Sequence, residues 1–122
     1  MPKGQRQKEK THCPSGHPYS DSNTFISQGS RRCRNCAREK VIARRFLNRS
    51  LIQDFCSHPC LDCKQSFPTY VMQFDHLPQY EKLFCIAVGH DYGTEKLMKE
   101  IDKCEVVCAN CHAERTWQRR NG

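Results

Sequence analysis

Eight cysteine and histidine residues fall into two groups whose spacing is typical of zinc sites. One group consists of two Cys-X-X-Cys pairs, Cys60 with Cys63 and Cys108 with Cys111. Such a pair turns the backbone so that both sulfurs face one ion, and two pairs complete the tetrahedral shell of structural zinc. The sequence therefore predicts a four-cysteine zinc site that joins two distant segments of the chain.

The second group lies closer to the N-terminus and consists of Cys13, His17, Cys33 and Cys36. These residues also form a complete set of four zinc ligands. His12 is an alternative to His17, but the Cys-X-X-X-His spacing favours His17, because adjacent side chains point apart in most backbone conformations. We therefore expect two structural zinc ions, one in each group.

Three cysteines lie outside both groups, and we expect them to be buried thiols rather than ligands. Cys85 lies within an apolar segment, which is typical of a core thiol. Cys104 shortly precedes the second Cys-X-X-Cys pair, and Cys56 precedes the first. The N-terminus has no signal peptide, so a cytoplasmic protein with reduced thiols is expected, and this favours zinc over disulfides.

Asp75, His76 and His112 have side chains suited to hydrolysis of a phosphate ester. A hard divalent cation prefers oxygen ligands such as the Asp75 carboxylate, and His112 can add an imidazole. The ordinary pKa of histidine lies near neutrality, so His76 could act as general base on a water molecule. Two alternatives remain open: His112 could bind zinc in place of Cys111, and His76 could be a structural histidine.

Three segments show apolar residues at helical spacing, and a polar segment near the N-terminus shows turn residues. The spacing predicts helices over residues 36–55, 94–102 and 109–119, with Thr94 as a possible N-cap of the second. In the first of these helices the apolar residues form one face that can pack, and arginines and lysines line the other. A short hairpin is expected around residues 24–26.

A strand is expected over residues 70–76, with residues 82–88 as its hairpin partner, because both segments are rich in aromatic and β-branched residues. Asp75 and His76 end the first strand and point to opposite faces. His112 directly follows the last cysteine of the four-cysteine site. That site therefore draws His112 towards the hairpin, and zinc assembles the three side chains.

The charge of the chain favours a polyanionic partner. Its formal net charge is +7, and only 37% of the residues are hydrophobic. Excess lysine and arginine attract nucleic acid through counterion release. Residues 1–11 are basic and predict a flexible tail. No apolar run is long enough to span a membrane, so we expect no membrane partner.

At this point the sequence resembles a known family. The residues FDH after a Cys-X-X-Cys pair, followed by CANCHAERT, are similar to the HNH endonucleases and their ββα-metal motif, over roughly residues 58–119. The resemblance implies a β-hairpin and a helix around one catalytic metal, and hydrolysis of a DNA phosphodiester. It assigns His76 as general base, and Asp75 and His112 as ligands of the catalytic metal.

One position departs from the family pattern. Lys103 stands where the middle asparagine of the motif is expected, and it could contact phosphate. Asn110, inside the second Cys-X-X-Cys pair, is the nearest asparagine and is a further candidate site residue. The N-terminal residues CPSGHPYSDSNTF and RRCRNCARE resemble small zinc modules beside HNH domains in phage and bacterial proteins, which implies DNA binding.

These observations predict a small α+β fold stapled by zinc, in which a small zinc module and a helix precede a ββα-metal (HNH) core. The expected parts are a tail over 1–11, a zinc module over 12–38, a linking helix over 39–57 and a nuclease domain over 58–120. We expect a metal-dependent DNA endonuclease using Mg²⁺, Mn²⁺ or a similar ion. The alternative is a non-catalytic zinc module that binds nucleic acid.

The expected location is the cytoplasm, or the host cytoplasm if the chain is viral. The oligomeric state, monomer or dimer, stays open. A redox role for the Cys-X-X-Cys pairs is disfavoured, because no thioredoxin-type βαβ pattern surrounds them.

Overall fold

The computed structural model describes residues 10–122, so most of the expected tail over 1–11 lies outside the described residues. The chain divides into two compact units at the junction of Ala43 and Arg44. The helix α2 (Arg34–Phe55) begins in the first unit and ends in the second. Among the described helices, none has the length and apolar character needed to cross a membrane.

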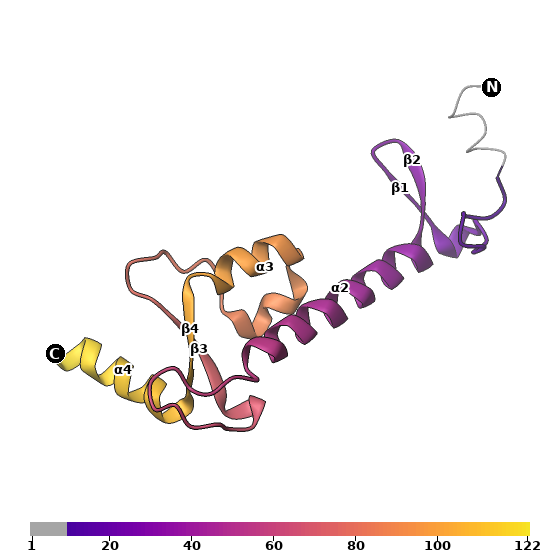
Figure 1. Ribbon diagram of the computed structural model, residues 1–122. Helices are drawn as coiled ribbons and strands as arrows, with labels where there is room; N and C mark the ends of the chain where they lie inside the picture. Colours follow the sequence, from indigo (N-terminus) through magenta and orange to yellow (C-terminus); the bar gives the residue numbers. More distant parts are fainter. Residues whose placement is uncertain (1–9) are drawn as a thin grey trace. The chain divides into compact units, whose positions relative to one another are not determined.

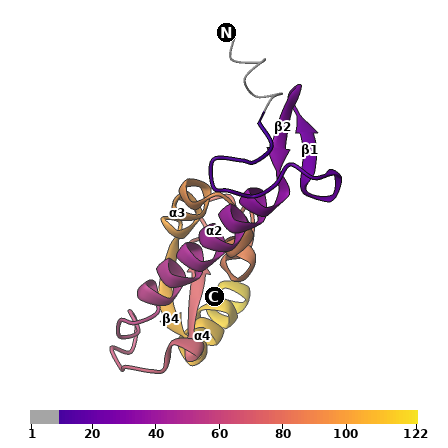
Figure 2. The ribbon, with the colours of Figure 1, turned by 90° about the vertical axis from the view of Figure 1, so that its right-hand side faces the viewer.

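The first unit contains a short hairpin that leads directly into α2 (Figures 1 and 2). A single turn of 3-10 helix, η1 (Asp21–Asn23), precedes β1 (Thr24–Ser27), which pairs antiparallel with β2 (Ser30–Cys33). The hairpin expected around residues 24–26 is thus confirmed. Its two-residue turn has φ of 52° at Gln28 and 76° at Gly29, and turns with two positive φ angles match the twist of paired strands.

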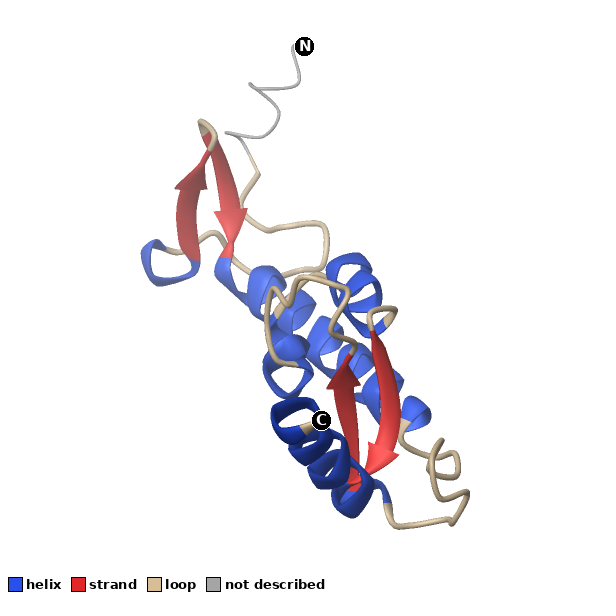
Figure 3. Cartoon of the chain, turned by 90° about the vertical axis from the view of Figure 1, so that its left-hand side faces the viewer, coloured by secondary structure: helices blue, strands red, loops and turns tan. Residues whose placement is uncertain are grey.

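The second unit is built on one antiparallel strand pair, with helices on both sides of it in the sequence. After α2 come η2 (Thr69–Val71), β3 (Met72–His76), η3 (Ile86–Asp91), α3 (Thr94–Ile101), β4 (Cys104–Cys108) and α4 (Ala109–Asn121). Strands β3 and β4 pair with Asp75 opposite Glu105. The helix α4 follows β4 and contacts both strands (Figures 1 and 3).

Two small apolar clusters hold the second unit together. One cluster contains Cys56, Cys60, Met72, Val107 and Cys108 and so includes two cysteines of the four-cysteine group. The other contains Phe84, Ile86, Leu97 and Ile101, and Phe74 packs partly against both clusters. Small domains with so little apolar core are usually stabilised further by disulfides, a metal or oligomerisation.

The predicted hairpin partner of β3 was wrong. Residues 82–88 form no strand; they end in η3, and Phe84 and Ile86 fill the second apolar cluster. The partner is β4, a segment for which the sequence pattern predicts no strand and which leads into the second Cys-X-X-Cys pair. A short, continuous apolar run has the same sequence pattern in a strand and in a buried loop. For this reason the pattern of residues 82–88 wrongly predicted a strand.

The helices differ from their predicted form in two respects. Gly93, not Thr94, occupies the N-cap of α3, and the Thr94 hydroxyl instead donates a hydrogen bond to Asn48 Oδ1 at 2.7 Å. Three residues of the predicted packing face of α2, Ile42, Phe46 and Leu47, are solvent-exposed, and Phe46 is 73% exposed. Only its last turns, at Ile52 and Phe55, reach an apolar cluster, because the helix is longer than the core beside it.

Candidate metal centres and the adjoining histidine cleft

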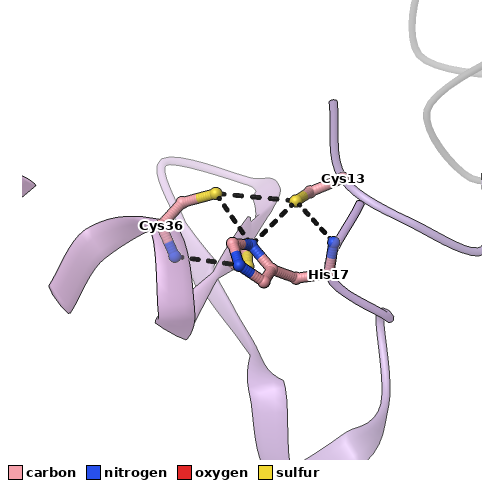
Figure 4. A group of neighbouring side chains, drawn as sticks. Cys13, His17 and Cys36 are labelled. Atoms are coloured by element: carbon pink, nitrogen blue, oxygen red, sulfur yellow. Dashed lines mark hydrogen bonds between the residues drawn. The ribbon is translucent and has the colours of Figure 1, made fainter. Parts of the chain in front are cut away.

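The N-terminal group is arranged to hold a metal ion. The ligand atoms of Cys13, His17, Cys33 and Cys36 all lie within 4.8 Å of one another. Nδ1 of His17 lies 3.3 Å from Cys13 Sγ and 3.4 Å from Cys36 Sγ, and the two sulfurs are 3.5 Å apart (Figure 4). Tetrahedral zinc with Zn–S bonds of about 2.3 Å separates sulfurs by about 3.8 Å, so this set fits zinc.

An interaction with Glu39 orients the His17 ring towards the cysteine sulfurs. Its Nε2 lies 3.2 Å from Glu39 Oε1, so the carboxylate holds a proton there and leaves Nδ1 free to face the sulfurs. Histidine ligands of metals commonly donate their other N–H in this way. His12 instead has its Nδ1 2.9 Å from the Thr11 hydroxyl and does not belong to the cluster.

Hydrogen-bond donors favour the thiolate forms of Cys13 and Cys33, whose pKa values are lowered, whereas the hydrogen bond with Cys13 raises the pKa of Cys36 to about 11. The side-chain amide of Asn23 donates to Cys33 Sγ at 3.2 Å, and the backbone N–H of His17 donates to Cys13 Sγ at 3.3 Å. Burial raises the pKa of Cys13, but the backbone hydrogen bond from His17 and other donors outweigh it and lower the pKa to about 6. A thiolate is the form that binds zinc.

The second group brings together a loop, a strand end and a helix start. The ligand atoms of Cys60, Cys63, Cys108 and Cys111 also lie within 4.8 Å of one another. Cys108 is the last residue of β4, and Cys111 lies in the first turn of α4. The Cys108 backbone N–H donates to Cys60 Sγ at 3.3 Å, and the Cys111 N–H donates to Cys108 Sγ at 3.4 Å. This cluster likewise suits a structural metal ion, and zinc fits its donors.

The three other cysteines stand apart from both clusters. Cys56 is buried, as expected, and Cys104 is half-buried, where burial raises the pKa of its thiol to about 12. The prediction of a core thiol at Cys85 was wrong, because that residue is exposed. The misassigned strand over residues 82–88 explains the error.

Asp75 is buried at the contact of β3 with α4, and three side chains of α4 surround its carboxylate: two arginines and one histidine. Arg115 donates to Oδ2 at 2.8 Å, and Arg119 donates to both carboxylate oxygens at 2.7 Å. Nε2 of His112 lies 3.4 Å from Asp75 Oδ1. Burial raises the pKa of Asp75, but the hydrogen bonds from Arg119 and Arg115 outweigh it and hold the pKa below its ordinary value.

His76 points away from Asp75 and pairs with a buried carboxylate on α3. Its Nε2 lies 3.1 Å from Glu100 Oε2, and Glu100 is only 1% exposed. Lys103 donates to Glu100 at 2.7 Å, and the Leu83 backbone N–H donates at 3.0 Å. Burial raises the pKa of Glu100, but these hydrogen bonds, led by that of Lys103, lower it to about 2. Glu100 is thus ionised, and His76 presents Nε2–H to it.

Sequence reasoning missed Glu100. The sequence feature that could have identified it as buried is its helical spacing, because Glu100 lies three residues after Leu97 and next to Ile101, on the buried face of α3. Lys103 is not a free phosphate contact, as was considered, because its ammonium group donates to Glu100 and to the Glu81 carbonyl oxygen at 2.8 Å.

His76 and His112 line one cleft of about 480 Å³ although they come from β3 and α4. Gln73 also lines this cleft, and its Oε1 lies 2.7 Å from His112 Nδ1. Asp75 contacts His112 but does not itself line the cleft. Asn110, a further candidate, is exposed in the first turn of α4 and does not line the cleft.

The three side chains predicted to meet, those of Asp75, His76 and His112, do not form one cluster. His112 contacts Asp75 directly, whereas His76 reaches the shared cleft from the opposite face of β3. Within residues 10–122, the two cysteine-containing groups are the sets of three or more side chains placed to hold a metal ion. Comparison with protein-family models, curated proteins and solved structures gives no match to this chain.

Proposed function

We propose that this protein is a metal-dependent DNA endonuclease of the HNH type, with His76 as its general base. The observation that carries the proposal is the pair of His76 and Glu100 at the edge of the cleft that His112 also lines. A buried carboxylate that orients a histidine in a cleft is typical of general-base sites. The basic net charge of +7 supports a nucleic-acid substrate.

The hydrogen bond to Glu100 leaves one nitrogen of His76 for chemistry. With the proton on Nε2, Nδ1 carries the lone pair, and no residue in the described part of the chain occupies it. Nδ1 accepts a proton from a water molecule, and the resulting hydroxide forms a bond to the phosphorus of a DNA phosphodiester held in the cleft. The bond from phosphorus to one of its two ester oxygens breaks, and that oxygen takes up a proton and leaves as the alcohol end of the cut strand. The ionised Glu100 stabilises the positive imidazolium that forms.

Asp75 and His112 are the residues that would hold a catalytic cation. Asp75 Oδ1 and His112 Nε2 are 3.4 Å apart, so one ion can reach both atoms. A carboxylate with an imidazole suits a transition-metal cation such as Zn²⁺ or Ni²⁺, whereas Mg²⁺ would be held by the Asp75 carboxylate together with water and phosphate oxygens. In either case Arg119 would have to give up its place at Asp75. When bound, such a cation supplies positive charge against the negative charge that develops on the phosphate.

The order of elements around the cleft also supports the proposal. Two antiparallel strands, β3 and β4, are followed at once by α4, and the four-cysteine group lies at the junction of β4 and α4. The structural metal is therefore separate from the exchangeable cation. Its role is to hold His112 against β3.

A plasmid assay tests the proposed activity. Supercoiled plasmid is incubated with zinc-loaded wild-type protein and with His76→Ala, each in the presence of Mg²⁺, Mn²⁺, Ni²⁺ or Zn²⁺. We expect the wild type to produce nicked circles with at least one of these cations and the variant to lose this activity. Equal behaviour of the two proteins contradicts the assignment of His76.

The same assay separates the second candidate function, a zinc module that binds nucleic acid without cutting it. This candidate is favoured by the ion pairs of Arg115 and Arg119 with Asp75. If anchoring α4 on β3 is the whole role of these ion pairs, Asp75 does not bind a cation. The second candidate predicts binding of DNA that weakens with salt and no cleavage with any cation. Cleavage that depends on His76 excludes it.

A further inference from the structure

One face of α4 presents an exposed tryptophan next to the proposed active site. Trp117 is 62% exposed, although indole rings in small proteins are mostly covered. It lines an open hollow of about 430 Å³ together with Ala113, Arg120, His112 and Gln73. The last two residues also line the cleft of His76, so the hollow and the cleft adjoin.

The two sides of α4 use their arginines differently. Arg115 and Arg119 point towards β3 and β4 and are bound by carboxylates, including Asp75. Arg120 lies on the exposed face and has no carboxylate partner among residues 10–122. The exposed face therefore offers a flat aromatic ring, an unpaired cation, and a small residue, Ala113, that leaves room beside the ring.

We propose that this face of α4 binds single-stranded DNA next to the bond that is cut, with a base stacked on Trp117 and a phosphate at Arg120. This inference rests on the proposed nuclease function. Every base has a π-face that can stack on an indole ring, and proteins that hold single strands combine such rings with cationic side chains. Arg120 supplies a positive charge for a phosphate, and His112 lines both this hollow and the cleft of His76, so a strand bound here would lie beside the cleft.

The single tryptophan of the chain makes this contact directly measurable. Zinc-loaded protein is titrated with an oligothymidine 12-mer, with a duplex of the same length and with inorganic polyphosphate, without added divalent cation. We expect the oligothymidine to quench Trp117 fluorescence, and polyphosphate to bind with little quenching because it has no bases. Duplex DNA should quench less than the single strand.

Two variants and a control define the contributions. The affinity of each variant is measured by the anisotropy of a dye-labelled oligothymidine, because Trp117→Ala has no tryptophan left to quench. Trp117→Ala should weaken oligothymidine binding by about tenfold or more, in the range of base–aromatic stacking. Arg120→Gln should weaken it and reduce the slope of its salt dependence by about one. Tyr80→Ala, which removes another exposed aromatic ring, should leave the affinity unchanged.

Three results overturn this inference: no binding of oligothymidine, binding without quenching, or equal quenching by polyphosphate. These outcomes are distinct from failure of the proposed function, because cleavage is measured separately on plasmid. DNA cleavage without a response of Trp117 would leave the nuclease proposal standing and remove this surface. Quenching without cleavage would remove the nuclease proposal and the position of this surface beside a cut bond, and would leave only the binding of single-stranded DNA at Trp117.

Discussion

At the scale of single residues, the Glu100 carboxylate and the His76 ring form a pair with a defined proton. Nε2 of His76 lies 3.1 Å from Glu100 Oε2, and the ionised carboxylate can only accept. We therefore predict that His76 is in the Nε2–H form at about pH 8, where an ordinary histidine is neutral. Nitrogen-15 NMR of histidine-labelled protein measures this, with His76→Gln identifying the signals.

Loss of the Glu100 carboxylate should affect both the ring and the rate. Glu100→Ala should remove the preference for the Nε2–H form and lower the cleavage rate by roughly tenfold or more. Glu95→Ala, which removes an exposed carboxylate from the same helix, serves as the control and should change neither. Finding the proton on Nδ1 in the wild type would show that Glu100 does not orient His76 as described.

The cysteine-containing groups could be predicted from the sequence, whereas Glu100 could not. Cysteine spacing alone placed both metal groups, and it chose His17 over His12, because short Cys and His spacings allow few arrangements around one ion. Glu100 could not be found in this way. Its importance depends on burial and on the donors of Lys103 and Leu83, which come from separate segments.

At the scale of elements, Asn48 connects the second half of α2 to the segment before α3. It is fully buried, its Nδ2 donates to the Tyr92 carbonyl at 2.8 Å and to the His90 carbonyl at 3.2 Å, and its Oδ1 accepts from Thr94. We predict that Asn48→Ala lowers the free energy of unfolding by about 2–4 kcal/mol, because three partly buried polar groups lose their partner.

Urea unfolding of the zinc-loaded protein measures this cost. Arg45→Ala is the comparison, because it removes the ion pair of Arg45 with Asp91 on the exposed side of the same helix. An exposed ion pair contributes less than about 1 kcal/mol. A similar loss of stability in both variants would mean that Asn48 is not a principal link between these elements.

The pairing of the strands was the element that sequence reasoning missed. The β3 partner was sought in the nearest apolar run, whereas β4 lies beyond α3 and is adjacent to the second Cys-X-X-Cys pair. Local pattern identified β3 and all three longer helices to within a few residues, because each has its own periodicity. Pairing across an intervening helix is a non-local property, and the cysteine spacing predicted only that the two Cys-X-X-Cys pairs meet.

At the scale of the whole molecule, the two cysteine-containing groups supplement the small apolar clusters. We predict two zinc ions per chain by elemental analysis, and one in Cys108→Ala, with loss of ordered structure in residues 44–122. Zinc binding to such sites contributes on the order of 10 kcal/mol, which is folding free energy. Cys85→Ala removes an exposed thiol outside both groups and should retain both ions. Two ions in Cys108→Ala would contradict the four-cysteine site.

The most direct test of the account is the rate at which His76 variants cut DNA. Labelled duplex is mixed with an excess of zinc-loaded wild type, His76→Ala or His58→Ala, in the cation that supports cleavage best. His58 is an exposed histidine outside the cleft, so His58→Ala controls for the loss of an imidazole. We predict a loss of at least about 100-fold in His76→Ala and an unchanged rate in His58→Ala. Equal rates for the two variants, or no cleavage by the wild type with any of the cations, would contradict the account.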